Sequence, residues 1–200
     1  MLQWVLAAAI GYLLGAIPVG FLVGQARGVD IRKFGSGATG GTNVLRTLGA
    51  GPAIFTGLCD VGKGLLGAYI GHRLAGEAGY AVGGFMAALG HSYSIWLKFR
   101  GGKSVATGAG ALALQYPLGL LISIVAALGA IVPTRWVSLG SLVGGMVYLI
   151  FVLVTGVHQA HKLMAVGLIA VVYIRHWENM KRIASGTENR IGQKARPRVE

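Results

Sequence analysis

Long apolar runs separated by short, polar, glycine-bearing stretches dominate this chain. Nearly uncharged runs of this length are typical of membrane-spanning helices, which need about 20 residues each. The first run has no basic segment before it and is too long for the apolar part of a signal peptide, so we expect it to be the first span. The pattern predicts helices over residues 2–25, 51–74, 80–96, 136–156 and 162–177.

Residues 104–134 carry no charged side chain at all. As one helix this interval would be about 46 Å long, well beyond a hydrocarbon core of about 30 Å. A polar break, Gln115-Tyr116-Pro117, stands in its middle, and proline disfavours helical geometry in the residue before it. Two short spans, or a re-entrant pair, therefore fit better than a single span.

The basic residues test this choice. With two crossings in the interval the chain has seven spans, and fifteen of the eighteen Lys and Arg residues fall on one side. With one crossing, Arg135 and the seven basic residues of the tail would move to the other side, against the positive-inside rule. We therefore predict an all-α polytopic membrane protein with seven transmembrane helices, its N-terminus outside and its C-terminus cytoplasmic. The fifteen residues are Arg27, Arg32, Lys33, Arg46, Lys98, Arg100, Lys103, Arg135, Arg175, Lys181, Arg182, Arg190, Lys194, Arg196 and Arg198.

Composition agrees with a membrane protein. Only 12% of the residues are charged, against about a quarter in soluble domains, so residues 1–200 are expected to form a single integral membrane domain. The net charge of +12 is explained by the positive-inside rule and by anionic headgroups, without nucleic acid. The lone Cys59 excludes a disulfide framework and a Cys-based metal site.

Half of the charged residues lie in three glycine-bearing stretches, residues 31–49, 97–107 and 173–192. With seven spans, all three lie at the cytoplasmic face. Flexible backbone rich in N–H groups and flanked by Arg and Lys suits phosphate. We therefore expect one composite site for phosphorylated ligands.

In the first stretch, glycines surround side chains that can donate hydrogen bonds from hydroxyl and amide groups. Arg46 adds a planar guanidinium group that can bind two phosphate oxygens at once. Asn43 would equally serve as a helix cap. The stretch is not a P-loop, because GxxxxGK[ST] is absent. The candidate binding residues here are Ser36, Gly37, Gly40, Thr42, Asn43 and Arg46.

The second stretch places Lys103 at the start of an apolar helix, whose N-terminus attracts anions. The simpler alternative is an ordinary basic loop. His91 lies eleven residues before Gly102 and either borders the site or is a packed histidine. The candidate binding residues here are Arg100, Gly101, Gly102 and Lys103.

In the third stretch, His176 and Asn179 are three residues apart and share a helix face. A solvated basic helix end is an equally good interpretation of this stretch alone. Glu188 is expected to organise the surrounding cations rather than bind a metal. Within the second span, Asp60 and Lys63 are predicted to form an i,i+3 ion pair that supports the first loop, in preference to contacting a ligand.

The glycine pairs Gly140/Gly144 and Gly79/Gly83 have the spacing that lets helix backbones approach closely. No cluster of His, Cys and carboxylates has metal-ligand spacing, and no GxSxG elbow is present.

Together the stretches resemble the bacterial polytopic glycerol-3-phosphate acyltransferases that use acyl phosphate, the PlsY family, over almost the whole chain. In this combination and order the motifs are highly specific. The family usually has asparagine at the position of Ala38, proline near Ser94 and glycine at the position of Ser104. The matching residues are Gly35, Ser36, Gly37, Gly40 and Thr42–Gly49; Asp60, Lys63 and Gly64; Gly90, His91, Phe99–Lys103 and Val105–Thr107; and His176, Asn179, Gly186, Glu188 and Arg190–Gly192.

The resemblance implies a seven-span enzyme of the bacterial cytoplasmic (inner) membrane, active at its cytoplasmic side. It would move an acyl group from acyl phosphate to the sn-1 hydroxyl of glycerol 3-phosphate, the first acylation of phospholipid synthesis. Acyl phosphate is already activated, so no cofactor and no metal is expected. The implied partners are these two substrates and membrane lipids, with no nucleic acid, and the protein is expected to be a monomer.

The implied roles divide between the substrates. Ser36, Thr42, Asn43 and loop amides would hold the acyl-phosphate phosphoryl group. Glycerol 3-phosphate would be held by Arg46, Lys103, His176 and Asn179. His91 and His176 are the candidate bases, and the acyl-phosphate oxygens are an alternative proton acceptor.

Two other classes of protein compete with this interpretation. A transporter or channel for an organic phosphate would need polar residues along a path near the membrane midplane, and repeat symmetry. The fourth to sixth spans offer almost no polar residues, and no internal repeat is apparent. A non-enzymatic scaffold gives no reason for three anion-binding stretches.

Overall fold

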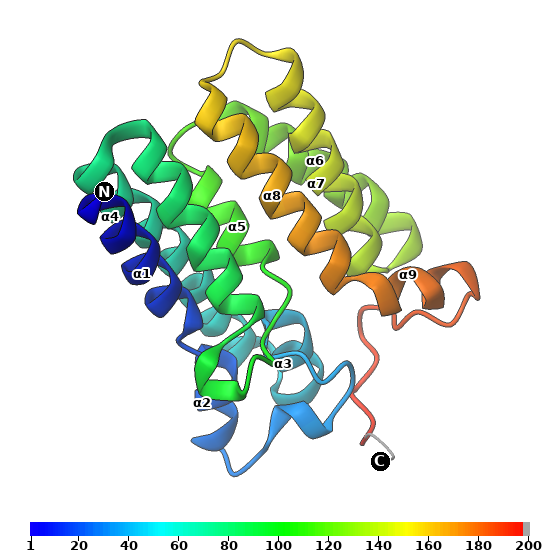
Figure 1. Ribbon diagram of the computed structural model, residues 1–200. Coiled ribbons are helices and arrows are strands. Elements are labelled where there is room, and N and C mark those ends of the chain that lie inside the picture. The colour runs from blue at the N-terminus through cyan, green and yellow to red at the C-terminus, as the bar shows by residue number, and fades with distance from the viewer. Residues whose placement is uncertain (198–200) are drawn as a thin grey trace.

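The structure, a computed structural model, describes residues 1–197 and consists of helices joined by turns and loops (Figure 1). Arg198, one of the basic residues considered above, lies outside the described residues. Four helical stretches are long and apolar enough to cross a membrane: 2–25, 50–97, 117–134 and 137–154. The elements are α1 (Leu2–Ala16), α2 (Val19–Gln25), η1 (Ile31–Lys33), α3 (Gly41–Leu48), α4 (Ala50–Ser92), η2 (Ile95–Leu97), α5 (Val105–Leu112), α6 (Pro117–Thr134), α7 (Val137–Val154), α8 (Gln159–Arg175) and α9 (Trp177–Ala184).

The first predicted helix is interrupted between α1 and α2. Pro18 follows Ile17 at this point, and proline cannot donate the backbone hydrogen bond that would continue the helix. The Ile17 carbonyl instead accepts a hydrogen bond of 3.0 Å from Lys63 Nζ on α4. The predicted bounds, residues 2–25, match one candidate membrane span, but the helix within it is interrupted because a single proline outweighed the apolar run.

The long element α4 contains two helices that meet at Ala75 and Gly76, whose backbone angles are not helical. The halves fold back on one another along glycines, and a Cβ at Gly79 or Gly83 would collide with the backbone of the other half. This confirms the close approach predicted for that glycine pair. Gly144 likewise packs on α6, where a Cβ would lie 2.9 Å from the Ser123 carbonyl.

The break predicted at Gln115-Tyr116-Pro117 is confirmed, because α5 ends at Leu112 and α6 begins at Pro117. The division is unequal. With eight residues, α5 is about 12 Å long, less than half of a hydrocarbon core. The predicted position of the break already limits the first segment to residues 104–114.

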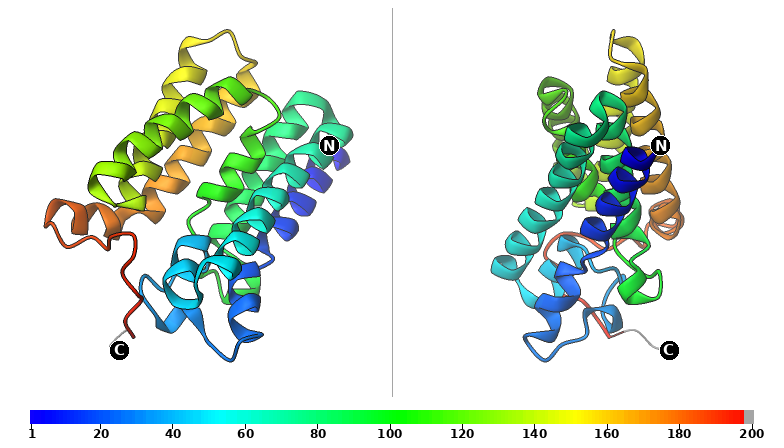
Figure 2. Two further views of the ribbon diagram at one scale, coloured as in Figure 1. Left: turned by 180° about the vertical axis from the view of Figure 1, so that it is seen from behind. Right: turned by 60° about the vertical axis from the view of Figure 1, so that its left-hand side comes forward.

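The helices form two groups that lie side by side (Figure 2). The first group contains α1, α4 and α5, and the second contains α6, α7 and α8, with α8 also packed on α4. A buried cluster that includes Tyr80, Leu112, Tyr148 and Met164 joins the groups. The loops with η1, α3, η2 and α9 gather at one end of the bundle, here called the loop end, and the N-terminus lies at the other (Figure 1).

Candidate phosphate-binding site

A polar cavity of about 250 Å³ lies where the two helix groups meet at the loop end. All three glycine-bearing stretches contribute to its walls. The lining residues are Ser36, Ala38, Gly40, Gly41, Thr42, Asn43, Arg46, Gly57, Asp60, His91, Lys103, Ser104, Val105, Ala106, Ala109, Val137, Ser138, Ser141, His176, Asn179 and Glu188.

The first wall is a loop organised by the side chain of Asn43. Its amide nitrogen donates to the carbonyls of Ile31, Phe34 and Ala38 at 3.0–3.2 Å, and its oxygen accepts from the Ser36 backbone N–H at 3.2 Å. Asn43 is 2% exposed, so this one amide satisfies backbone groups from four places in the loop. Its hydrogen-bonding capacity is therefore used in shaping the loop.

Two helix N-termini face the cavity. Gly40, Gly41 and Thr42 begin α3, and Val105 and Ala106 begin α5. The first N–H groups of a helix have no partner within the helix, and the helix dipole places partial positive charge there. Two such ends around one cavity create a field that favours an anion.

The cations of the cavity are connected across the two helix groups. Lys103 Nζ, before α5, donates a hydrogen bond to Asn179 Oδ1 on α9. Asn179 Nδ2 donates at 2.7 Å to Glu188 Oε1. The same carboxylate accepts from Ser138 Oγ at 3.0 Å and from Arg182 Nε at 2.8 Å. Because a carboxylate only accepts, Glu188 turns the amide oxygen of Asn179 toward Lys103.

Lys103 has a pKa that is shifted by its surroundings in the cavity. Burial lowers the pKa of its ammonium to about 8, further lowered by nearby arginines and partly restored by Glu188. An ammonium that has lost most of its hydration gains more from a phosphate oxygen than one in water does.

Arg46 approaches the cavity from α3 and is tied to the C-terminal tail. Its Nη2 donates to the Asn189 carbonyl at 3.0 Å, and its own carbonyl accepts from Ala195 N at 3.1 Å. The tail also meets the glycine loop, since Gly35 N donates to the Arg196 carbonyl at 2.9 Å. The first and third stretches are thus bonded to each other directly.

The predicted ion pair of Asp60 and Lys63 is confirmed, with 2.9 Å between Oδ1 and Nζ. It is joined by His91, whose Nδ1 lies 3.4 Å from the same oxygen. The other side of the His91 ring packs against Gly102, where a Cβ would collide with Nε2. His91 therefore connects the buried ion pair to the backbone that carries Lys103.

His176 lies at the junction of α8 and α9, with Nδ1 2.8 Å from the Val172 carbonyl. A carbonyl only accepts, so Nδ1 carries the proton and donates it to this bond. In the neutral ring Nε2 is then an acceptor, and His176 lines the cavity.

Four predicted site residues do not line the cavity: Gly37, Arg100, Gly101 and Gly102. Arg100 is exposed. The carbonyls of Gly101 and Gly102 accept hydrogen bonds from Arg175 at 3.2 and 3.1 Å, which anchors the second stretch to α8. The other predicted residues, namely Ser36, Gly40, Thr42, Asn43, Arg46, His91, Lys103, His176, Asn179 and Glu188, all line it.

Sequence reasoning missed two hydroxyls of α7, Ser138 and Ser141, that also line the cavity. They are three residues apart at the start of an otherwise apolar helix, which is the one signal that could have identified them. Ser104, which stands where the family usually has glycine, also lines the cavity. It adopts φ of +60°, a conformation that favours glycine, and its buried hydroxyl bonds the Ala88 carbonyl and Ser92.

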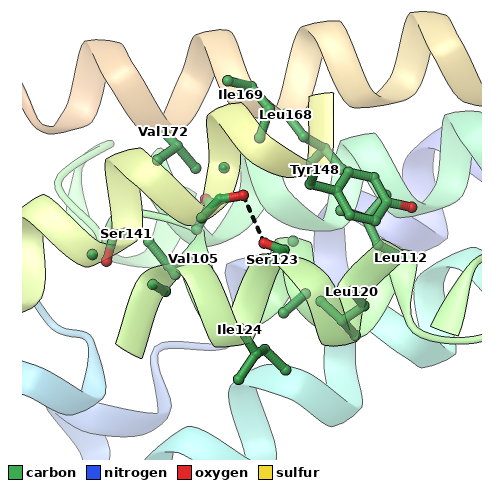
Figure 3. A pocket seen from close by; sticks show the side chains of 17 residues that line it. Val105, Leu112, Leu120, Ser123, Ile124, Ser141, Tyr148, Leu168, Ile169 and Val172 are labelled. Atoms are coloured by element: carbon green, nitrogen blue, oxygen red, sulfur yellow. Dashed lines mark hydrogen bonds between the residues drawn. The ribbon is translucent and has the colours of Figure 1, made fainter. Parts of the chain in front are cut away.

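An apolar groove of about 130 Å³ continues from the polar cavity into the bundle, between α5, α6, α7 and α8 (Figure 3). Ser104, Val105, Ala109 and Ser141 line both spaces. Farther in, the walls are aliphatic except for the Tyr148 ring and Ser123, whose hydroxyl donates to the Gly144 carbonyl at 2.6 Å. A site with one polar part and one apolar part suits an amphiphilic ligand.

The fold and the site define a multi-pass helical membrane protein with a polar cavity at one end of its helices. Residues 5–186 match the family model described as glycerol-3-phosphate acyltransferase, and the chain belongs to this family. It is 60% identical to the glycerol-3-phosphate acyltransferase of Symbiobacterium thermophilum over 199 residues, covering 100% of each chain. The identity to the Carboxydothermus hydrogenoformans enzyme is 43%, over 94% of this chain and 96% of the relative.

Two crystal structures of PlsY (YgiH), an integral membrane glycerol 3-phosphate acyltransferase, have the same fold. The glycerol 3-phosphate form superposes with a TM-score of 0.90 at 34% identity, over 94% of this chain and 96% of that one. The lysophosphatidic acid form gives 0.87 at 33% identity, over 94% and 95%.

Proposed function

We propose that the protein transfers a fatty acyl group from acyl phosphate to the sn-1 hydroxyl of glycerol 3-phosphate, releasing lysophosphatidic acid and phosphate. One observation carries this: the polar cavity and the apolar groove are neighbours that share Ser104, Val105, Ala109 and Ser141 in their walls. The cavity suits two phosphate groups and the groove suits a fatty chain. The family, and the glycerol 3-phosphate and lysophosphatidic acid forms of PlsY, support the acceptor and the product.

In this reaction the glycerol hydroxyl oxygen attacks the acyl carbonyl carbon. A new C–O ester bond forms, the bond from the acyl carbon to the phosphate oxygen breaks, and phosphate leaves with the bonding electrons. The donor is a mixed anhydride with a good leaving group, so positioning and electrostatic stabilisation supply most of the required catalysis. No cofactor or covalent intermediate enters the proposal.

The phosphoryl group of the donor is assigned to the start of α3, with Ser36, Gly40 and Thr42. Asn43 acts indirectly by shaping that loop. Glycerol 3-phosphate is assigned to Arg46, Lys103 and Asn179, which approach the cavity from both helix groups.

His176 is the proposed proton acceptor, because its Nδ1–H is committed to the Val172 carbonyl and its Nε2 is left to accept. His91 is assigned a positioning role through its contact with Gly102. Gly37, Arg100, Gly101 and Gly102 are not assigned substrate contacts.

The proposed topology has seven passages: α1 with α2, each half of α4, the segment 104–116 that contains the short helix α5, and then α6, α7 and α8. The N-terminus is outside, and the loop end faces the cytoplasm at the inner membrane. Gathering of the three basic stretches at one end of the bundle supports this orientation through the positive-inside rule. The whole chain acts as one domain and as a monomer.

The decisive experiment uses the purified protein in proteoliposomes. Phosphate release from palmitoyl phosphate should require glycerol 3-phosphate and yield 1-acyl product, whereas acyl-CoA and acyl carrier protein should not serve as donors. Arg46→Ala and Lys103→Ala should raise the KM for glycerol 3-phosphate. Transfer from a thioester donor alone would overturn the choice of donor, and 2-acyl product would overturn the sn-1 assignment.

A cysteine-labelling experiment tests the topology. In a Cys59→Ser background, single cysteines at Ala75 and Thr187 should react with an impermeant maleimide from opposite sides of sealed cells or vesicles. Labelling of both from the same side would contradict the proposed orientation.

A further inference from the structure

The apolar groove has a closed inner end. Leu112 of α5, Tyr148 of α7 and Leu168 of α8 line this end and are 5%, 2% and 1% exposed. All three also belong to the buried cluster that continues toward Tyr80 and Met164. The space beyond the Tyr148 ring is therefore occupied by close-packed core, and a ligand cannot extend past it without displacing that core.

The closed inner end is here called the floor of the groove, and its distance from the polar cavity follows from helix geometry. Ser141, which the groove shares with the polar cavity, and Tyr148 lie seven residues apart on α7, or about 10 Å. A lipid acyl chain reaching from one face to the bilayer midplane crosses about 15 Å, half of the hydrocarbon core. The groove is therefore shallower than such a chain is long.

The groove has an opening on its side. Val105 of α5 and Ile124 of α6 line it and are 39% and 46% exposed. Both are apolar and exposed at the surface of the helix bundle, so in a membrane the end of a long chain could turn between them into lipid. Beyond the floor, additional methylenes would exchange one apolar environment for another and gain no further binding energy.

We infer that Tyr148 is a specificity-determining residue, whose ring sets the length of acyl chain that the protein binds before the chain passes into lipid. The inference rests on the proposed acyl transfer and adds to it a preference for acyl chains up to a certain length. The first methylenes of the chain lie along α7 inside the groove, and the segment beyond the Tyr148 ring contributes nothing to selectivity.

This predicts a break in the dependence of rate on chain length. With a saturated acyl phosphate series, kcat/KM should rise with each added methylene that packs against the groove walls, and then level off once the chain reaches the floor. In Tyr148→Ala the break should move to longer chains, because removal of the ring deepens the groove. In Tyr148→Phe it should stay, since the ring is kept.

Gly108 offers a change in the opposite direction. A Cβ at this position would have only Leu168 Cδ2 near it, at an ordinary 3.9 Å, and Gly108 lines the groove. Gly108→Ala therefore adds a methyl group to the groove while favouring the helix, and should move the break to shorter chains. It keeps the test valid if Tyr148→Ala does not fold.

The matched control is Val152→Ala. Val152 is 1% exposed in the same cluster but does not line the groove, so this variant loses core packing without changing the chain path. Its break should coincide with that of the unmodified protein. Ratios of variant to unmodified protein at each chain length remove differences in substrate partitioning.

The outcomes are distinct. An unchanged break in both Tyr148→Ala and Gly108→Ala would overturn the role of Tyr148 while leaving acyl transfer intact. An equal shift in Val152→Ala would overturn it as well, because general loosening would then explain the change. Absence of glycerol 3-phosphate-dependent phosphate release at every chain length in the unmodified protein would instead refute the proposed function.

Discussion

Lys103 and Asn179, 76 positions apart in the chain, are joined by a hydrogen bond from the ammonium to the side-chain oxygen of the amide. The bond connects the two helix groups across the polar cavity. Its direction depends on Glu188, which receives the Asn179 N–H at 2.7 Å. The cation, amide and carboxylate therefore form one unit, and changing any of them should affect the other two.

Glu188→Gln should lower kcat more than it lowers stability. Glutamine presents one oxygen and one NH₂ group to three donors, from Ser138, Asn179 and Arg182, so Asn179 is no longer held in one orientation. Loss of one charge-assisted hydrogen bond, about 1.5–3 kcal/mol, corresponds to roughly a 10- to 100-fold effect. Steady-state kinetics with glycerol 3-phosphate as the varied substrate measures it. Normal kcat in a folded Glu188→Gln protein would show that the carboxylate does not orient the site.

The pH profile should report the ionisation of Lys103. Its pKa is lowered to about 8 by burial, so the ammonium is charged below that pH and becomes neutral above it. Attraction for phosphate is lost in the neutral form, and kcat/KM for glycerol 3-phosphate should fall toward tenfold per pH unit above about 8. Lys103→Arg, which keeps its charge throughout this range, should show a flat profile there even if its overall activity is lower. A decline of equal steepness in Lys103→Arg would assign the ionisation to another group.

Gly102→Ala should reduce activity by moving His91 or the backbone before Lys103. The added methyl group would overlap His91 Nε2, and the His91 ring is enclosed by Gly102 on one side and Asp60 on the other. In the double variant His91→Ala/Gly102→Ala the space is available, so the two losses should be less than additive by at least about 0.5 kcal/mol in a kinetic double-mutant cycle. Strict additivity would mean that the two residues act independently.

Asn43→Ala should destabilise the protein by several kcal/mol. The side chain satisfies three carbonyls and one N–H in the loop, and each buried polar group left without a partner costs about 1–3 kcal/mol. A lower midpoint of thermal inactivation in detergent, with a raised KM for acyl phosphate, is the expected result. Thr47→Ala is the control, because the Thr47 hydroxyl makes one bond, of 2.8 Å, to the Asn43 carbonyl within the same helix. Equal shifts in the two variants would show that Asn43 is no more than an ordinary helix residue.

Several features of the fold could be predicted from local sequence. Gln115-Tyr116-Pro117 indicated a break, and the structure has one there. The spacing of Asp60 and Lys63 indicated an ion pair, which is present at 2.9 Å. Both predictions concern residues a few positions apart, where helix geometry alone determines which side chains meet.

Pro18 shows where local interpretation was incomplete. Its effect on the first helix could have been predicted, but the hydrogen bond from Lys63 of another helix to the nearby Ile17 carbonyl could not. Asn43 is similar. The sequence indicated that its amide would either bind phosphate or cap a helix. Its hydrogen bonds to the carbonyls of Ile31, Phe34 and Ala38 depend instead on how the loop folds back over α3.

The sequence by itself determined that this is a membrane protein and which residue types its basic glycine-bearing stretches offer to an anion. Those conclusions rest on hydrophobic transfer and on local backbone and charge chemistry, which act within a few residues. Only the tertiary structure decided that Ser138 and Ser141 join the cavity, that Glu188 orients Asn179 toward Lys103, and that Tyr148 closes the groove. These contacts connect segments that are far apart in the chain. They depend on how the two helix groups pack against each other, and the sequence of any one segment does not determine that packing.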